Sequence, residues 1–195
     1  MAAPKNLDIK DLNGTTWIAN RSLSGDSDSV LALQGVHYVI RTILSAGQIT
    51  VCIKQWEGED GATHFEMQNQ ISAGLPGLTD TYKTDFEPKQ YSDPIFGTVR
   101  DRSRWIGIEE LEDEYQKTEW EEGTTKTLEL FTDHLDTGAT TSQVCGFELI
   151  EGERRYTRRL VVKKGEEVLH VRLVFDYVGG EDLENDADAE DDSEG

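Results

Sequence analysis

The sequence lacks the apolar runs that a membrane-spanning helix requires. No window approaches the roughly 18 apolar residues that cross a bilayer, and residues 1–14 (MAAPKNLDIKDLNG) lack the apolar core of a secretory signal. Basic residues are also scarce, since 19 Lys and Arg stand against 39 Asp and Glu, for a formal charge of −20. Nucleic acids and anionic membrane surfaces bind Lys and Arg. We therefore expect a cytoplasmic protein with no nucleic-acid partner and no membrane insertion.

Side chains that bind metals or act as nucleophiles are few and isolated. Cys52 and Cys145 lie within predicted strands, where buried thiols are expected rather than a nucleophile. Carboxylates are abundant, but almost all fall in turns or near the C-terminus, where water keeps their pKa values ordinary. No nucleophile elbow, phosphate loop or dinucleotide fingerprint occurs. The histidines are scattered singly, without metal-ligand spacing: His37, His64, His134 and His170. We expect no metal and no cofactor.

One stretch near the N-terminus differs from the rest because its apolar residues recur at helical spacing. Residues 14–21 have the composition of a strand, and Ser24–Asp28 (SGDSD) is a cluster of turn and N-cap residues. A short apolar turn over 30–33 ends at Gln34-Gly35, and 36–44 then has one apolar face at helical spacing. This pattern predicts two short helices that cover the open end of a β-structure.

Beyond this stretch, the pattern is one of short alternating strands separated by turns. In residues 48–56, for example, Ile49, Val51 and Ile53 share one face and polar residues the other. Such regular spacing predicts an all-β antiparallel barrel or sandwich. Ten strands are predicted: 15–23, 48–56, 64–71, 78–86, 95–106, 115–120, 126–135, 143–150, 154–163 and 168–178.

The two ends of the chain differ in composition from the part between them. Residues 1–12 have the character of a leader with little burial. Residues 180–195 contain nine acidic side chains and no basic one, and are too poor in apolar groups to fold. We predict a single β-barrel domain over 13–179, between this N-terminal leader and a disordered acidic tail. A chain of 195 residues is long enough for one such domain with a substantial core.

Three short motifs carry a resemblance to a known group of proteins. They are Gly14-Thr-Thr-Trp17, the segment Leu33-Gln-Gly-Val36 with Arg41 downstream, and the closing hairpin Arg154–Tyr177. Together they resemble the calycin superfamily, in particular the intracellular fatty-acid-binding proteins, with lipocalins more distant. The longer segments Asn13–Trp17 and Leu31–Val36, with the Tyr-Thr-Arg-Arg run at 156–159, also resemble small lipocalin-like proteins of filamentous fungi.

This resemblance spans most of residues 13–178 and implies a specific fold. It implies a roughly ten-stranded antiparallel calycin-type β-barrel with a short helix-turn-helix lid after the first strand. A barrel of this size leaves interior space that side chains need not fill. The interior is then a site for one small hydrophobic molecule, entered beneath the lid.

In the fatty-acid-binding family an Arg-x-Tyr pair on the last strand binds the ligand carboxylate, and this chain departs from that pattern. Its predicted last strand places Arg172 and Tyr177 on opposite faces. One strand earlier, Tyr156 and Arg158 are two residues apart and share a face, so this pair is the candidate for binding an anion. The alternative is that Arg158, Arg159 and Arg172 all lie outside, paired with the acidic surface.

Further candidate ligand contacts lie in the lid and on the strands. Tyr38 lies in the lid, one turn from Arg41, whereas Trp17 is expected to close the far end of the barrel. The large apolar residues of the strands are either cavity lining or plain core, and the sequence leaves both open. The candidate ligand-binding residues are Tyr38, Arg41, Phe65, Met67, Tyr82, Phe96, Phe147, Tyr156, Arg158 and Arg172.

Two functions follow from this reading. The first is a carrier, a monomer or weak homodimer that binds a small hydrophobic metabolite or lipid in the barrel. The second is a cofactor-free cyclase or isomerase, because some calycin-fold proteins of fungal metabolism promote cyclisations, including Diels–Alder reactions, by holding a substrate in one reactive conformation. Such a reaction needs only a side chain that polarises a carbonyl, and the catalytic candidates are Tyr156, Arg158 and His170. The two functions differ in whether the ligand leaves chemically changed.

Overall fold

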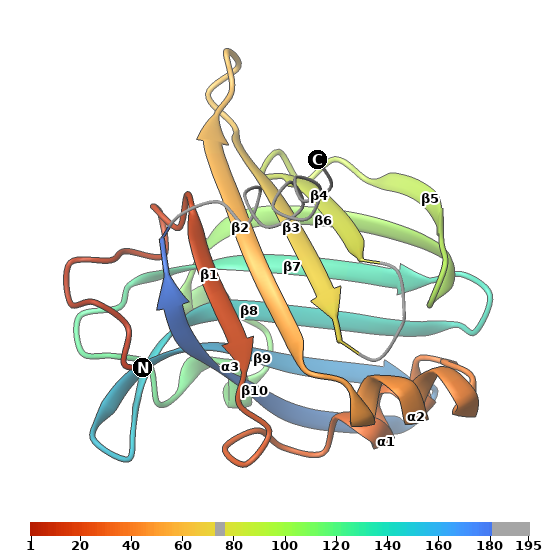
Figure 1. Cartoon of the computed structure of the whole chain (residues 1–195). Coiled ribbons are helices and arrows are strands. Elements are labelled where there is room, and N and C mark those ends of the chain that lie inside the picture. Colours follow the sequence, from red (N-terminus) through yellow and green to blue (C-terminus); the bar gives the residue numbers. More distant parts are fainter. Residues whose placement is uncertain (73–76, 181–195) are drawn as a thin grey trace, which may run out of the picture.

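Ten antiparallel strands form one strongly curled sheet, a half-barrel with two helices at one end (Figure 1). The computed structural model describes residues 1–72 and 77–180. The spatial order of the strands is β4-β3-β2-β1-β10-β9-β8-β7-β6-β5. Their bounds are β1 (Thr15–Ala19), β2 (Ile49–Glu57), β3 (Thr63–Ile71), β4 (Leu78–Lys83), β5 (Lys89–Asp93), β6 (Gly97–Gly107), β7 (Lys126–His134), β8 (Ala139–Ile150), β9 (Glu153–Lys164) and β10 (Glu167–Gly179). The predicted all-β calycin-type architecture is confirmed. The predicted acidic tail lies, from residue 181 on, outside the described residues.

One of the ten predicted strands was wrong and one observed strand was missed, so the total is nevertheless correct. Residues 115–120, predicted as a strand, contain the short helix α3 (Glu114–Lys117), because the Asp113 carboxylate accepts a hydrogen bond from the backbone N–H of Tyr115 and caps it. Lys89–Asp93, which lies outside all ten predicted strands, is strand β5. This polar segment has no alternating pattern of its own and becomes a strand by pairing with β6.

The helical pair predicted after the first strand consists of α1 (Ser27–Leu33) and α2 (Tyr38–Ala46). The Asp26 carboxylate caps α1 by accepting hydrogen bonds from two backbone N–H groups. Gly35 ends this helix with a φ of 94°, a conformation that favours glycine. The buried residues Val30 and Leu33 of α1 pack on β9 and β10. Within the described residues, no helix is both long and apolar enough to cross a membrane.

The opposite end of the barrel is closed by the N-terminal segment, which was expected from its composition to be little buried. This expectation was wrong, because Leu12 is completely buried and Ala3 and Ile9 nearly so. The Arg154 guanidinium donates hydrogen bonds to the carbonyl oxygens of Pro4 and Leu7, at 2.7 and 2.9 Å. This segment is held in place by a few apolar residues and by hydrogen bonds to its backbone. Such contacts leave no periodic pattern in a sequence, so they could not be predicted from it. The segment lies at the end away from α1 and α2 (Figure 1).

The outer face of β8 and β9 is covered by the connection between β6 and β7. This connection contains the short 3₁₀ helix η1 (Ile108–Glu110) and α3. The Trp120 ring approaches so closely that a Cβ atom at Gly146 would lie 2.6 Å from it. A glycine is therefore required at this position of β8, and the cover is a packed part of the fold.

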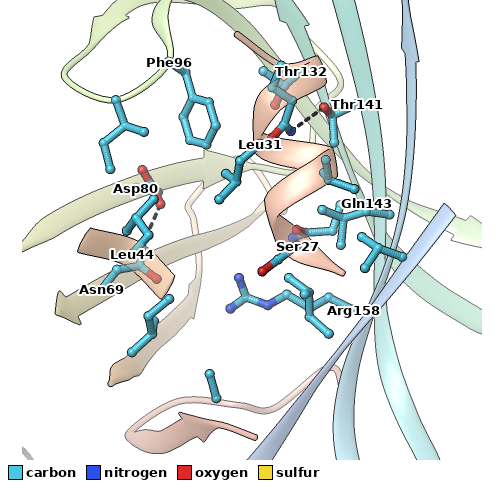
Figure 2. Close-up of a pocket in the computed structure, with 18 of the residues that line it drawn as sticks. Ser27, Leu31, Leu44, Asn69, Asp80, Phe96, Thr132, Thr141, Gln143 and Arg158 are labelled. Atoms are coloured by element: carbon cyan, nitrogen blue, oxygen red, sulfur yellow. Dashed lines mark hydrogen bonds between the residues drawn. The ribbon is translucent and has the colours of Figure 1, made fainter. Parts of the chain in front are cut away.

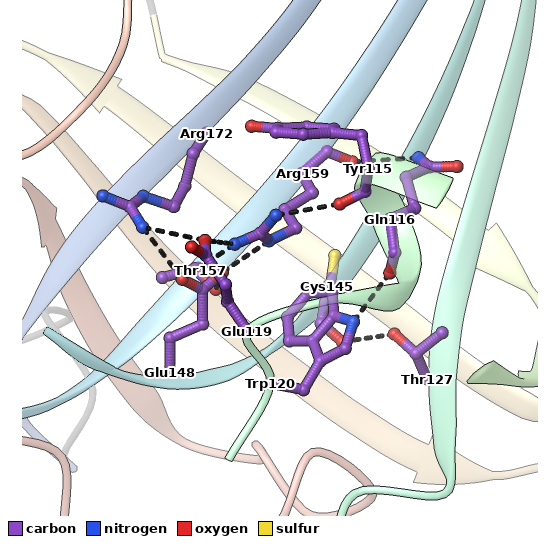
Figure 3. A network of polar contacts seen from close by, with 10 residues as sticks. All are labelled: Tyr115, Gln116, Glu119, Trp120, Thr127, Cys145, Glu148, Thr157, Arg159 and Arg172. Carbon is purple, nitrogen blue, oxygen red and sulfur yellow. Dashed lines mark hydrogen bonds and ion pairs between the residues drawn. The ribbon is translucent and has the colours of Figure 1, made fainter. Parts of the chain in front are cut away.

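Beneath this cover lies a network of charged side chains on the outside of the barrel (Figure 3). The Arg159 guanidinium donates a 2.8 Å hydrogen bond to the Glu148 carboxylate, another to the Tyr115 carbonyl oxygen, and pairs with Glu119. Arg172 pairs with the same Glu148 at 3.1 Å. Both Arg159 and Glu148 are 1% exposed, and these several bonds offset the cost of desolvating them. Arg159 and Arg172 therefore belong to the outer face.

The burial of Leu12 can be tested by truncating its side chain. We expect Leu12→Ala to lower the free energy of unfolding by about 2–4 kcal/mol, because it leaves a cavity in the closed end. The control Leu149→Ala removes the same atoms from a side chain that is 70% exposed and should change stability by less than about 0.5 kcal/mol. Denaturant unfolding measures both, and equal effects would contradict the placement of Leu12 in the core.

Candidate functional site

A cavity of about 520 Å³ lies between the two helices and the inner face of the sheet (Figure 2). This volume falls in the range of small-molecule sites, roughly 300–1,000 Å³. Its wall is mostly apolar, with side chains from both helices and from strands on each side of the barrel. Representative apolar members are Leu31, Leu44, Ile71, Phe96, Leu130, Leu160 and Leu173. The structure thus provides a largely apolar compartment beneath the helical pair.

Four of the candidate ligand contacts instead form the core of the closed half of the barrel. They are all at most 4% exposed and belong to one cluster around Trp17: Phe65, Met67, Phe147 and Tyr156. The ring of Tyr156 lies 5.1 Å from that of Trp17 and 5.6 Å from that of Phe175. The strand pattern does not distinguish lining from core, because both lie on the same face of the sheet. The three-dimensional packing makes these four residues core.

Three further candidates lie outside the cavity. Tyr38, on α2, is 69% exposed and stacks near the Arg41 guanidinium. Arg172 is engaged with Glu148 on the outer face. The His170 Nε2 atom lies 3.2 Å from the Asp113 carboxylate, also outside, so His170 does not share a compartment with Arg158.

The four candidates that the cavity does bring together are Arg41, Tyr82, Phe96 and Arg158. Arg41 comes from α2 and donates a 2.5 Å hydrogen bond to the Asp28 carboxylate of α1, so it is already neutralised. Phe96 lies on the far wall from Arg158 in Figure 2. Burial raises the pKa of Tyr82, so its hydroxyl stays neutral. Of these four residues, Arg158 is the charged one that still needs a partner to be identified.

Arg158 points its guanidinium into the cavity and is only 9% exposed (Figure 2). Its Nε donates to the Tyr156 hydroxyl at 3.2 Å, Nη2 lies 3.7 Å from the Met67 sulfur, and the group lies 4.9 Å from the Phe175 ring centre. It forms no ion pair with a carboxylate in 1–72 or 77–180. A buried guanidinium without an anion is costly, which makes it a strong hydrogen-bond donor toward a bound molecule.

Across the cavity from Arg158 lies a group of carboxylates that are not among the candidate residues predicted from the sequence. Asp80 comes from β4, Asp93 from β5 and Asp101 from β6. Burial and the nearby Asp93 raise the pKa of Asp80 to about 6, and Asn69 donates a 2.8 Å hydrogen bond to it. Burial likewise raises the pKa of Asp101, which accepts a 2.6 Å hydrogen bond from Tyr91. The expectation that carboxylates keep ordinary pKa values is wrong for Asp80 and Asp101.

A sequence signal for Asp80 existed but was weak. Within β4, Leu78, Asp80 and Tyr82 alternate with two threonines, so the carboxylate shares a face with two largely apolar side chains. Since β4 and β5 are the two edges of the sheet, Asp80 and its acidic neighbours face each other across the seam between these edges. Farther along, Ser103 joins the two sides by donating to the Lys83 carbonyl oxygen at 2.8 Å. Only the curling of the sheet brings the carboxylates together.

His134 and Gln34 fix the wall on the other side of α1. The Gln34 side chain donates a 2.8 Å hydrogen bond to the Thr141 hydroxyl, which holds the end of α1 against β8. The Nε2 atom of His134 lies 3.0 Å from the same hydroxyl. Burial lowers the pKa of His134, so this imidazole is neutral near neutral pH. The positive charge in the cavity therefore comes from arginine.

Comparison with known proteins finds relatives of similar length, although no family model matches the chain. A protein named pericyclase pydY, from an Acremonium species, is 37% identical over 182 residues, which cover 92% of this chain and 98% of that protein. A protein named probable pericyclase scpY, from Mollisia scopiformis, is 36% identical over 181 residues, covering 91% and 95%.

Solved structures of fatty-acid-binding proteins share the fold at low sequence identity. Echinococcus granulosus fatty-acid-binding protein 1 is 16% identical with a TM-score of 0.53, covering 84% of this chain and 96% of its own. The REP1-NXSQ fatty acid transporter is 13% identical with a TM-score of 0.52, covering 88% and 98%. These likenesses show the calycin fold that the motifs predicted.

The raised pKa of Asp80 predicts a pH-dependent stability difference. The fold holds the Asp80 proton to higher pH than the unfolded chain, so its ionisation destabilises the fold as pH rises from about 4 to about 6. Asp80→Asn removes this ionisation. We expect the variant to be more stable than the wild type by about 2 kcal/mol near pH 7.5 and nearly equal to it near pH 4. Denaturant unfolding at both pH values measures this, and a variant less stable at pH 7.5 would contradict it.

Proposed function

The chain belongs to the family of the fungal proteins pydY and scpY, and from this premise we propose that it is a cofactor-free pericyclase acting on a small hydrophobic molecule in its cavity. The relatives are named as a pericyclase and a probable pericyclase, and the matches run over nearly the whole of each chain. Membership alone does not define chemistry, so the proposal depends on what the cavity contains.

The observation that carries the proposal is the Arg158 guanidinium, which lies in a largely apolar cavity and forms no ion pair with a carboxylate of the described residues. A pericyclic cyclisation forms its new σ bonds from π electrons already in the substrate, so the product is an isomer and no nucleophile, oxidant or cofactor is consumed. The reaction needs a substrate folded into one reactive conformation and, for a carbonyl-activated alkene, a hydrogen-bond donor on the carbonyl oxygen. The enclosed cavity can restrict how a substrate folds, and Arg158 is a hydrogen-bond donor within it.

Arg158 acts in this scheme through the carbonyl oxygen of the substrate. Hydrogen bonds from the guanidinium stabilise the electron density that builds on this oxygen as the new bonds form. The surrounding apolar side chains exclude water, which strengthens such hydrogen bonds. The wall that Leu31 and Phe96 help to form limits how a flexible chain folds. Arg158 is therefore the catalytic residue we propose, with Tyr156 as its positioning residue through the 3.2 Å hydrogen bond to Nε.

A carrier is the second candidate, and the fold supports it. Solved structures named as a fatty-acid-binding protein and a fatty acid transporter share this fold. A carrier would also benefit from a cation in the cavity that binds an acidic head group. Both functions require a ligand to bind in the cavity, but they differ in whether the ligand is converted. A carrier releases its ligand unchanged, whereas a pericyclase releases an isomer.

Arg158→Gln tests the proposed catalytic role. The substrates are linear polyenes that carry an α,β-unsaturated carbonyl, and the readout is a new chromatographic peak of unchanged mass and of one stereoisomer. We expect the variant to convert them about 100-fold more slowly, because the charged donor is lost, with a much smaller change in KM.

The matched control for this experiment is Arg100→Gln. Arg100 lies on the outer face and pairs with Asp133, so its loss should leave conversion near the wild-type rate. Circular dichroism confirms that both variants fold. Wild-type turnover by Arg158→Gln would refute the role of Arg158, and no conversion of any polyene by the wild type would favour the carrier.

Native mass spectrometry of the protein purified from its source separates the two candidates independently. We expect a bound hydrophobic molecule in a 1:1 complex, because an apolar cavity of about 520 Å³ is large enough to take a ligand. Under the pericyclase proposal, the extracted molecule is a cyclised isomer of a linear precursor that the protein also accepts. A single bound molecule that the protein never converts supports the carrier instead.

A further inference from the structure

We propose that Asp80 is the second polar contact for the substrate, donating a hydrogen bond in its acid form from the wall opposite Arg158. This inference deepens the proposed function and rests on it. Two donors facing one another across an apolar cavity require a molecule with acceptor oxygens. The substrate class is therefore a carbonyl-bearing or acidic hydrophobic molecule and not an amine.

Asp80 accepts fewer hydrogen bonds from the protein than Asp93 and as many as Asp101. Asp93 accepts hydrogen bonds from the backbone N–H groups of Ile95 and Phe96, at 2.7 and 2.8 Å. Asp101 accepts the 2.6 Å bond from the Tyr91 hydroxyl. Asp80 accepts one bond, at Oδ2, from the Asn69 amide. Its Oδ1 has no donor among the described residues, and Asp80 lines the cavity.

The carboxylates face one another across the seam, and a proton on one of them relieves their repulsion. Asp93 already accepts hydrogen bonds from two backbone N–H groups, whereas Asp80 accepts one, so we place the proton on Asp80. The pKa of Asp80 is about 6, raised by burial first and by the charge of Asp93 second. The ionisable groups that act on Asp80 from the elements around it are Asp93 of β5, Asp101 of β6 and Arg158 of β9.

Arg158 favours a ligand that accepts hydrogen bonds over a ligand that carries an amine. An ammonium group would be attracted by the carboxylates but would leave the buried guanidinium without a partner and close to a like charge. A carbonyl or carboxylate oxygen accepts hydrogen bonds from Arg158 and from protonated Asp80 alike. A ligand that displaces water from the cavity also deepens the burial of Asp80 and so favours its acid form. The geometry therefore points to an acceptor.

The experiment measures binding of two fluorescent probes by the full chain at about pH 5.5 and pH 7.5. Both carry a dansyl group on a long alkyl chain, which ends in a methyl ester in one probe and in a primary amine in the other. The ester does not titrate, so any pH dependence of its binding comes from the protein. With a pKa of about 6, Asp80 is mostly protonated at the lower pH and about 3% protonated at the higher.

We expect the wild type to bind the ester up to about 20-fold more tightly at pH 5.5 than at pH 7.5. Asp80→Asn should bind it equally at both pH values and close to the tighter wild-type value, because an asparagine amide donates at every pH. The control Glu66→Gln removes a negative charge from the outer face of β3, next to Lys54, and should behave like the wild type. The amine probe should bind more weakly than the ester at both pH values.

The outcomes separate this inference from the proposed function. Ester binding that is independent of pH in the wild type, or that Asp80→Asn weakens at both pH values, would overturn the role of Asp80 alone. Tighter binding of the amine than of the ester would overturn the substrate class. If neither probe binds at either pH, the cavity is not a ligand site, and the proposed function fails together with the inference.

Discussion

The alternation of strand β9 sends two adjacent arginines to opposite sides of one sheet, and the chemistry of the molecule depends on this separation. Arg159 lies outside, where Glu148 and Glu119 neutralise it. Arg158 lies inside, where none of the described carboxylates pairs with it. Strand β9 therefore attaches the outer cover to the barrel through Arg159 and supplies the cavity with the positive charge of Arg158. A register slip of one residue would exchange these roles.

The two ends of the barrel divide its interior into a packed half and an open half. Trp17, Tyr156 and the N-terminal segment fill the closed end. At the other end α1 rests on β9 and β10 without filling the space beneath it, which leaves the cavity. A cavity forgoes packing contacts and so lowers stability. The tightly packed half offsets this cost and holds Arg158 in position through Tyr156.

Features that depend on residues close together in the sequence were predictable. The helical pair has its Asp26 cap and its Gly35 termination, and most strands have a period of two. The errors fall where strand pairing, a single cap or a distant contact overrides the local hydrophobic pattern. β5 is a strand because it pairs with β6, and 114–117 is helical because of one cap. The burial of Leu12 depends on the surrounding barrel, and the attachment of its segment on Arg154, 142 positions farther along the chain.

The sequence by itself determined the fold class, the place of the helical pair and the pairing of Tyr156 with Arg158 on one face, because each follows from the spacing of neighbouring residues. The tertiary structure alone decided which face is inside. It placed Arg158 in the cavity, removed His170, Arg172 and Tyr38 from it, and brought Asp80 opposite Arg158. Burial and charge repulsion then raised the pKa of Asp80. These are properties of an environment assembled from β3, β4, β5, β6 and β9, and no single segment of the chain contains them.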